Sequence, residues 1–305
     1  MAGPNGRVAV FWGCRALTGD LPFEMSTRAV LRALGVPFED LRGQACCGEP
    51  VRSLNVSASC YLALRLLALA SKQGFEDLLV PCSKGYYMMR WAPKILASSG
   101  IIRERVEKAL ASEGLNPQEL ARPWSLVDFL YERVGPNKIA ISCQDPLSLR
   151  VAIHPGCYLL RAGERGEGSE RLERLRAILE AVGVEAPYYP GIDECCGGTL
   201  EAIRPDAALA LAGSKLKAAS EAGLACLVVA CPACFEMLDG RQEEALGAVG
   251  GGKAMPVLYL TQLLGLALGL RPDELGLQFN RSPVEDIGSI VGRGARAGSA
   301  SSASS

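Results

Sequence analysis

The sequence predicts an α/β protein built from two pseudo-equivalent domains, each a mostly parallel sheet covered by helices. Three observations support this prediction. Short apolar segments typical of buried strands alternate with longer helix-like segments, the pattern of parallel sheets. The pattern occurs twice along the 305 residues, of which 49% are apolar. The cysteines follow directly after the predicted strands, where open α/β sheets gather their ligands.

Each copy is expected to run as strand, cysteine loop, helix, strand, double-cysteine loop, helix, strand, cysteine loop and helix. The first strand runs into Gly-Cys, the second follows a helix that ends in glycine, and the third ends in Pro and Cys or in Cys-Pro. The matching segments, first copy before second, are 7–17 and 150–160, 31–50 and 179–199, and 71–89 and 220–238. Residues 124–135 and 256–269 are predicted to be equivalent closing helices.

The spacing of the cysteines supports a duplication. Cys14 and Cys157 lie 143 residues apart, whereas Cys46 and Cys195 lie 149 residues apart, as do the later matching pairs. One insertion of six residues explains the step, and the acidic, glycine-rich segment 161–170 is the expected place for it. A self-similarity that holds its register over four anchors indicates an internal repeat.

The repeat predicts the domain boundaries. We expect an N-terminal domain over 1–133, a linker over 134–149 and a C-terminal domain over 150–282. The tail, 283–305, is small and polar and is predicted to be disordered.

Composition narrows the class of protein. A net charge of −1 gives no basic footprint for nucleic acid. No secretory signal is visible, and the most apolar windows, 61–70 and 257–270, are shorter than the ~20 residues that span a bilayer. We therefore expect a cytoplasmic chain without a transmembrane segment. Twelve cysteines in such a chain indicate thiolate ligation of metal rather than disulfides.

The second copy offers five thiolates from three loops. Its cysteines are Cys157, the adjacent pair Cys195 and Cys196, and the pair Cys231 and Cys234 in a Cys-x-x-Cys segment. A structural zinc ion takes four ligands, commonly from two closely spaced knuckles, and a cubane [4Fe–4S] cluster also takes four. Five thiolates that include sequence neighbours indicate a polynuclear iron–sulfur centre, in which adjacent cysteines bind different irons.

At these residues the chain resembles the cysteine-rich CCG family, and its two tandem copies are similar to the B-type subunit of heterodisulfide reductase. The resemblance implies a noncubane [4Fe–4S] cluster on Cys157, Cys195, Cys196, Cys231 and Cys234. It also implies cleavage of a disulfide between two clusters in one-electron steps. The implied partners are a C-type iron–sulfur subunit and an A-type flavin subunit, and in a sulfur-oxidising version the substrate is sulfur bound to a carrier.

The first copy departs from the family pattern. It keeps Cys14, Cys46, Cys47 and Cys82, but Gly85 stands where the second copy has Cys234. Four thiolates suit a second iron–sulfur cluster of a different kind, or zinc. An iron without a fifth thiolate is also a place where a sulfur substrate could bind.

The remaining candidates lie around these sites. His154, the only histidine, precedes the cluster loop; it is either a satisfied core residue or a cluster ligand and proton donor with a pKa near neutrality, and we predict a catalytic role. Lys84 and Arg15 flank the first site and are interpreted as solvated charges, the alternative being attraction of an anionic substrate. The other cysteines, Cys60, Cys226 and Cys143, fall outside the repeat, the first two as core thiols.

Three functions follow from this pattern. The first is an iron–sulfur redox subunit of a heterodisulfide-reductase-like complex, acting on disulfide, thiol or protein-bound sulfur; with no dinucleotide-binding motif, its electrons pass through other subunits. The second is a CCG electron-transfer subunit of an atypical succinate dehydrogenase or fumarate reductase, which passes electrons to quinone and needs an exposed amphipathic helix. The third is a zinc-binding scaffold without redox activity.

Overall fold

The computed structural model describes residues 7–163, 166–285 and 287. The predicted disordered tail lies almost entirely outside the described residues, as does part of the loop expected to hold the insertion. The first half contains a four-stranded parallel sheet in the order β2-β1-β3-β4. Its strands are β1 Val8–Val10, β2 Phe38–Asp40, β3 Asp77–Val80 and β4 Arg122–Ser125.

The second half repeats this sheet. Its strands are β5 Leu149–Arg150, β6 Ala152–His154, β7 Val184–Glu185, β8 Leu227–Val229 and β9 Val257–Tyr259. β5 pairs with β7, and β6 pairs with β8, which pairs with β9, all in parallel. Only Val151 separates β5 from β6. Followed through that residue, the strand order matches the order of the first half.

The strand register confirms the duplication predicted from the sequence. Ala9 pairs with Leu78 in the first sheet, and Ala152 pairs with Leu227 in the second. These partners are related by the same two offsets, 143 and 149 residues, that relate the cysteines. The predicted fold class, α/β with two mostly parallel sheets, is therefore confirmed.

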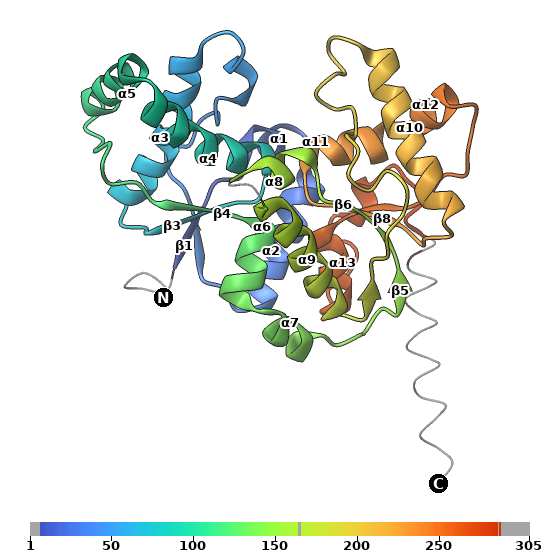
Figure 1. Ribbon diagram of the computed structural model, residues 1–305. Helices are drawn as coiled ribbons and strands as arrows, with labels where there is room; N and C mark the ends of the chain where they lie inside the picture. Colours follow the sequence, from blue (N-terminus) through green and yellow to red (C-terminus); the bar gives the residue numbers. More distant parts are fainter. Residues whose placement is uncertain (1–6, 164–165, 286, 288–305) are drawn as a thin grey trace.

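Helices cover both sheets (Figure 1). The helices of the first half are α1 Gly13–Thr18, α2 Leu21–Ala33, α3 Val56–Lys72, α4 Ser83–Ser98, α5 Gly100–Ser112, α6 Leu126–Phe129 and α7 Pro136–Ser142. Those of the second half are α8 Cys157–Arg161, α9 Glu167–Glu180, α10 Pro205–Glu221, α11 Pro232–Phe235, α12 Gln242–Ala248 and α13 Leu260–Ala267. Helices α3 and α10 both begin and end 149 residues apart, as the repeat requires.

The segment expected to be a linker is partly helical. It contains α7, and the backbone N–H groups of Gln144 and Asp145 donate to the carbonyl of Ala267, at 2.8 and 3.1 Å. The segment is therefore attached to α13 of the second half. The domain boundaries remain predictions, because the two halves share one interface rather than standing apart.

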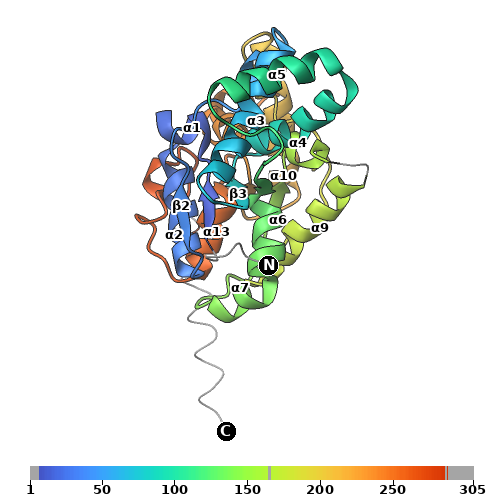
Figure 2. The same ribbon diagram turned by 90° about the vertical axis from the view of Figure 1, so that its left-hand side faces the viewer.

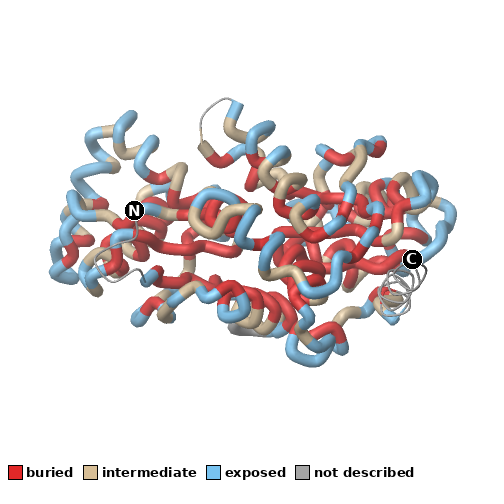
Figure 3. Tube along the Cα trace, turned by 90° about the horizontal axis from the view of Figure 1, so that it is seen from below, coloured by how far each residue is buried: buried red, intermediate tan, exposed pale blue. Residues whose placement is uncertain are grey.

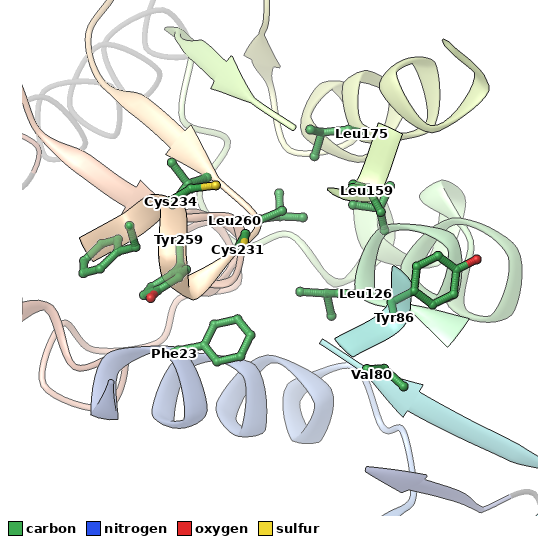
Figure 4. Close-up of a cluster of buried hydrophobic side chains, with 14 of the residues drawn as sticks. Phe23, Val80, Tyr86, Leu126, Leu159, Leu175, Cys231, Cys234, Tyr259 and Leu260 are labelled. Carbon is green, nitrogen blue, oxygen red and sulfur yellow. The ribbon is translucent and has the colours of Figure 1, made fainter. Parts of the chain in front are cut away.

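At that interface, helices of one half pack against helices of the other. Helix α2 of the first half packs against α13 of the second, and α9 of the second half packs against α6 of the first (Figure 2). Seen from below, the buried part of the trace runs through both halves without interruption (Figure 3). Phe23 on α2 faces Tyr259, with ring centroids 5.0 Å apart (Figure 4). Ser26 shares a 2.7 Å hydrogen bond with Thr261.

The matching contact on the other side is ionic. The Arg171 guanidinium on α9 donates to the Asp128 carboxylate at 2.9 Å, and both side chains are only 5% exposed. Arg174 pairs with the same carboxylate at 2.8 Å, and Tyr86 donates to it at 3.3 Å. These charge-assisted bonds hold the pKa of Asp128 below its ordinary value against the opposing effect of burial.

Among the described residues, every helix is too short or too polar to cross a bilayer. The window at 257–270 is almost wholly buried, and about half of the window at 61–70 is. Neither forms an exposed apolar helix.

Removing one partner of this ionic contact should destabilise the junction. Arg171→Met leaves the Asp128 carboxylate buried with fewer partners, and we expect it to lower the free energy of unfolding by about 3–5 kcal/mol. Arg150→Met removes the exposed pair with Glu185 (3.6 Å) and should cost no more than about 1 kcal/mol. Urea unfolding followed by circular dichroism measures both, and equal losses would contradict the structural role of Arg171.

Candidate metal centre

The nine cysteines predicted as ligands meet at one edge of the two sheets. Four of them lie just after strands, in or at the start of a helix: Cys14 in α1, Cys82 at the start of α4, Cys157 in α8 and Cys231 at the start of α11. Cys234 lies within α11, and the double cysteines follow β2 and β7. Because all strands are parallel, their carboxyl ends lie at the same edge.

In the second half, five thiols form a connected series that we call the C-terminal site. Cys195 is hydrogen-bonded to both Cys157 and Cys196. The Cys196 sulfur lies 3.4 Å from the Cys234 sulfur, and Cys234 is hydrogen-bonded to Cys231. Cys196, Cys231 and Cys234 are buried, whereas Cys157 and Cys195 are half-buried. The ligand atoms of Cys196, Cys234 and His154 all lie within 4.8 Å of one another.

Glycines allow these loops to close around the thiols. Gly197 follows the cysteine pair with φ of +83°, and a Cβ there would lie 2.4 Å from the carbonyl oxygen of Ala208 on α10. Its backbone N–H points to the Cys195 sulfur at 3.4 Å. Gly48 is the counterpart in the first half, with φ of +85° and an N–H directed at Cys46 at 3.3 Å. A side chain at either position would push the double-cysteine loop off its helix.

In the first half, four thiols form the N-terminal site. Cys46 is hydrogen-bonded to Cys47, and Cys14 and Cys82 both interact electrostatically with Cys47. Cys47 is buried, Cys46 and Cys82 are half-buried, and Cys14 is exposed. Solvent therefore reaches this site more easily than the C-terminal site.

The two sites touch. Cys82 and Cys231, which occupy equivalent positions in the repeat, are hydrogen-bonded to each other across the junction of the halves. The Ser83 hydroxyl lies 3.4 Å from the carbonyl of Ala230 at the same place. Ser83 and Lys84 of the first half also line a small cavity together with thiols of the C-terminal site. The two sites are thus linked through Cys82 and Cys231.

The pKa values of the thiols indicate which of them ionise without a bound cation. Hydrogen bonds from Cys157 and Cys196 lower the pKa of Cys195 to about 2, and the bond from Cys47 lowers the pKa of Cys46 to about 6. The pKa of Cys231 is lowered by its bonds from Cys234 and Cys82. The thiols that donate these hydrogen bonds have raised pKa values, and the bonds are the largest cause. These thiols are Cys47, Cys82, Cys157, Cys196 and Cys234. A full set of thiolates needs bound cations here, since buried like charges repel.

His154 contacts the C-terminal site directly. Its Nε2 lies 3.2 Å from the Cys234 sulfur, while Nδ1 is buried without a hydrogen-bond partner among the described residues. Burial, followed by the charge of Lys215, lowers the pKa of His154 to about 3. The ring is therefore neutral, contrary to the expected pKa near neutrality, because β6 ends in a closed core. Its role as ligand or proton donor stays a prediction.

Lys215 is a site residue that the sequence interpretation missed. It is fully buried on α10, and its ammonium group donates to the carbonyls of Gly191 and Ile192, which lead into the double cysteine. Burial lowers its pKa, and its charge interacts with Cys196 and Cys234. In a single sequence, nothing distinguishes a buried lysine on an alanine-rich helix from a solvent-exposed one. Comparison of the two repeats does mark this position, because the matching residue is the apolar Leu66.

The remaining predicted residues have ordinary surroundings. Cys60 and Cys226 are fully buried in the core, as expected, and Cys143 is half-buried after α7. Arg15 is exposed, as interpreted, and forms an ion pair with Glu236 of the second half, whereas Lys84 is partly covered and pairs with Glu49 at 3.5 Å.

A polar cavity of about 540 Å³ opens between α1 and the turn after α11. Its lining includes Arg15, Asp20, Phe235 and Arg281, of which Arg15 and Phe235 directly follow Cys14 and Cys234 in the sequence. Tyr259 donates to Asp20 at 2.9 Å. Burial raises the pKa of Asp20 to about 6, although this bond and Arg15 oppose the shift.

Together, the fold and the site define a duplicated cysteine-rich α/β protein with thiolate metal sites. Residues 8–90 and 151–239 match the family model CCG, the cysteine-rich domain. The chain is 31% identical to a heterodisulfide reductase B-subunit-like protein of Archaeoglobus profundus, over 88% of this chain and 93% of that protein. It therefore belongs to the CCG-domain family that includes the B-type subunits of heterodisulfide reductase.

Further relatives widen this picture. The chain is 29% identical to the B-type subunit of the ferredoxin:CoB-CoM heterodisulfide reductase of Methanosarcina mazei, covering 90% of this chain and 93% of that one. It is also 29% identical to the 8-methylmenaquinol:fumarate reductase membrane anchor subunit of Wolinella succinogenes, covering 89% and 95%. A hypothetical protein from Helicobacter pylori shares the fold, with a TM-score of 0.74 at 15% identity, over 91% of this chain and 52% of that one.

Family membership and the cysteine-rich domains support iron–sulfur electron transfer, and the C-terminal site fits it. Its donors are soft thiolates, which suit iron–sulfur clusters. Gly156, with φ of +86°, leaves its Cβ position open 3.7 Å from the Cys234 sulfur, so the backbone comes close to the sulfurs. Cys157, Cys195, Cys196, Cys231 and Cys234 would hold the cluster.

The raised pKa of Asp20 predicts a pH-dependent cost to stability. The folded protein favours the neutral carboxyl, so stability is full below the ordinary pKa of 3.8 and falls as pH rises through about 6. Asp20→Asn should remove this loss and raise the free energy of unfolding at pH 8 by about 1–2 kcal/mol, with little change at pH 4. Asp206→Asn, at an exposed carboxyl whose pKa is lowered by Arg204, is the control and should give no gain at pH 8. Urea titrations at both pH values measure this, and a gain at pH 4 would contradict it.

Substitution should distinguish the predicted ligand cysteines from the core cysteines by its effect on iron content. Cys196→Ser removes a sulfur that contacts both Cys195 and Cys234, so the iron of the C-terminal cluster should be lost: about half of the iron per chain if the N-terminal site holds a cluster, and nearly all of it if that site holds zinc. Cys60→Ser changes a buried thiol outside the site and should leave iron unchanged. Iron and acid-labile sulfide analysis of anaerobically purified protein measures both, and equal loss from the two variants would reject the assignment of ligands.

Proposed function

We propose that the chain is the iron–sulfur redox subunit of a heterodisulfide-reductase-like complex and that it handles disulfide, thiol or protein-bound sulfur substrates. The contact between Cys82 and Cys231 carries the proposal, because it brings two thiolate sites against each other. A disulfide bound at that junction would be close to both sites. The two heterodisulfide reductase relatives, matched over most of their length, support the same function.

The proposed overall step is balanced by two electrons and two protons. Cleavage of one S–S bond gives two thiols, and the reverse direction oxidises sulfur on a carrier. When bound, iron–sulfur clusters supply or accept these electrons singly. We propose a noncubane [4Fe–4S] cluster in the C-terminal site, and a second iron–sulfur cluster, or zinc, in the N-terminal site.

The residues of the chain have distinct parts in this proposal. The five thiolates of the C-terminal site bind the cluster, and the Lys215 ammonium offsets part of their negative charge. The neutral His154 contacts the Cys234 sulfur through Nε2 and, with its N–H on that atom, stabilises the thiolate by a hydrogen bond; passing a proton to sulfur would require the imidazolium, which burial disfavours. The protein excludes water from Cys231 and Cys234, both at most 4% exposed.

Electrons reach the chain through partner subunits in this proposal. The partners are a C-type iron–sulfur subunit and an A-type flavin subunit, and the complex acts in the cytoplasm. Leu54 and Ile203 occupy equivalent positions after the two double-cysteine loops and are 84% and 76% exposed. Exposed apolar side chains so near the sites favour a contact with a partner there.

A second candidate function is electron transfer to quinone. The similarity to the 8-methylmenaquinol:fumarate reductase subunit favours it. The structure gives it less support, since neither apolar window forms an exposed amphipathic helix. A zinc scaffold is the weakest candidate, because five linked thiols exceed the four ligands of one tetrahedral ion.

Anaerobic purification with metal analysis and disulfide turnover tests the proposal. The protein should contain iron and acid-labile sulfide and give an EPR signal, and reduced methyl viologen should reduce bis(2-hydroxyethyl) disulfide with two viologens oxidised per disulfide. His154→Ala should lower the rate while iron is kept. Turnover of a menaquinone analogue but not of the disulfide would favour the second function, and a colourless protein containing only zinc would overturn the redox function.

A further inference from the structure

The two metal sites differ at a matched pair of positions. Through the repeat, Gly85 corresponds to Cys234, and Phe11 corresponds to His154. In the C-terminal site these two positions hold a cysteine and a histidine 3.2 Å apart. In the N-terminal site both members of the pair are replaced, the thiol by glycine and the imidazole by a buried phenyl ring.

The phenyl ring packs beside the position that a fifth thiolate would occupy. A Cβ built on Gly85 would lie 3.4 Å from Cε1 of Phe11 and 3.1 Å from Cγ1 of Val80, before any sulfur is added. The valine does not cause the difference, because Val229 occupies its place in the second half, where Cys234 is accommodated. Gly85 lies in helix α4 and has no positive φ, so its backbone suits cysteine. Phe11, at ordinary van der Waals distance, is therefore the neighbour of this position that differs between the two halves.

A third position follows the same trend. The buried Lys215 beside the C-terminal site corresponds to Leu66, which is also fully buried. Histidine and lysine thus make the surroundings of the C-terminal site polar. Phenylalanine and leucine make the matching surroundings of the N-terminal site apolar. A fifth thiolate in the N-terminal site would lack both the hydrogen bond and the nearby positive charge that Cys234 has.

We infer that the N-terminal site binds metal through four thiolates only and does not bind the five-thiolate centre of the C-terminal site. The inference rests on the proposed iron–sulfur function. Cys14, Cys46, Cys47 and Cys82 are its complete set of cysteine ligands, and Phe11 stands where the C-terminal site has the histidine that contacts its fifth thiol. The chain then carries two chemically different centres in contact, one buried and one reached by solvent through Cys14.

Reciprocal exchange of the matched pairs tests this. The full chain is loaded with ⁵⁷Fe and studied by Mössbauer spectroscopy, with iron, sulfide and zinc counted per chain. The wild type should give either two distinct iron components, or one component together with one zinc. Phe11→His with Gly85→Cys should convert the N-terminal component to that of the C-terminal site, and His154→Phe with Cys234→Gly should do the reverse. Gly85→Cys alone should leave the wild-type pattern, because the added thiol would lie beside Phe11 and lack the imidazole contact that Cys234 has.

Several outcomes would overturn the inference. They are a single five-thiolate component present twice in the wild type, conversion by Gly85→Cys alone, and an N-terminal site that holds neither iron nor zinc. The wild-type spectrum distinguishes these outcomes even if a double variant fails to fold, which circular dichroism reports. Absence of iron from every form would instead reject the proposed function, so the two failures are distinguishable.

Discussion

The contact between Cys82 and Cys231 depends on how the two halves are joined. One helix of each half packs against the other half: α2 packs against α13, and α9 packs against α6. These two contacts fix the relative position of the sheets. The carboxyl ends of β3 and β8 then face each other, so the cysteines that follow these strands meet. One half alone would expose its part of the shared core and separate the two sites. The protein therefore folds and assembles its metal sites through the same interface.

Grouping nine thiols at this interface is unfavourable without metal. Hydrogen bonds from neighbouring thiols lower the pKa of only some sulfurs, and burial opposes ionisation of the others. Bound metal removes that cost, and for this reason metal binding and stability are coupled. The glycines after each double cysteine contribute by letting backbone N–H groups reach Cys46 and Cys195. The site is thus shaped for charge that only metal can balance.

Family membership and local geometry answer different questions. The relatives include heterodisulfide reductase subunits and a fumarate reductase subunit, so the family carries sulfur and quinone chemistry alike. The contact between two unlike thiolate sites favours sulfur chemistry for this chain. The asymmetry of the sites also gives them separate parts: the C-terminal site is buried and polar, and the N-terminal site is more exposed and has apolar surroundings.

The repeat determined much of this protein without coordinates. Its two offsets predicted two equivalent, mostly parallel sheets, and the pairing of Ala9 with Leu78 and of Ala152 with Leu227 follows the same offsets. The fourth strands, β4 and β9, were not predicted, because they lie where the closing helices were expected to begin. The spacing of the cysteines identified the candidate ligands. Only the tertiary structure decided that Cys82 meets Cys231, that His154 is neutral, that Lys215 lies beside the thiols and that Phe11 packs beside Gly85. Strand periodicity and cysteine spacing are local in the sequence, whereas burial, charge and contact between the halves depend on segments that only folding brings together.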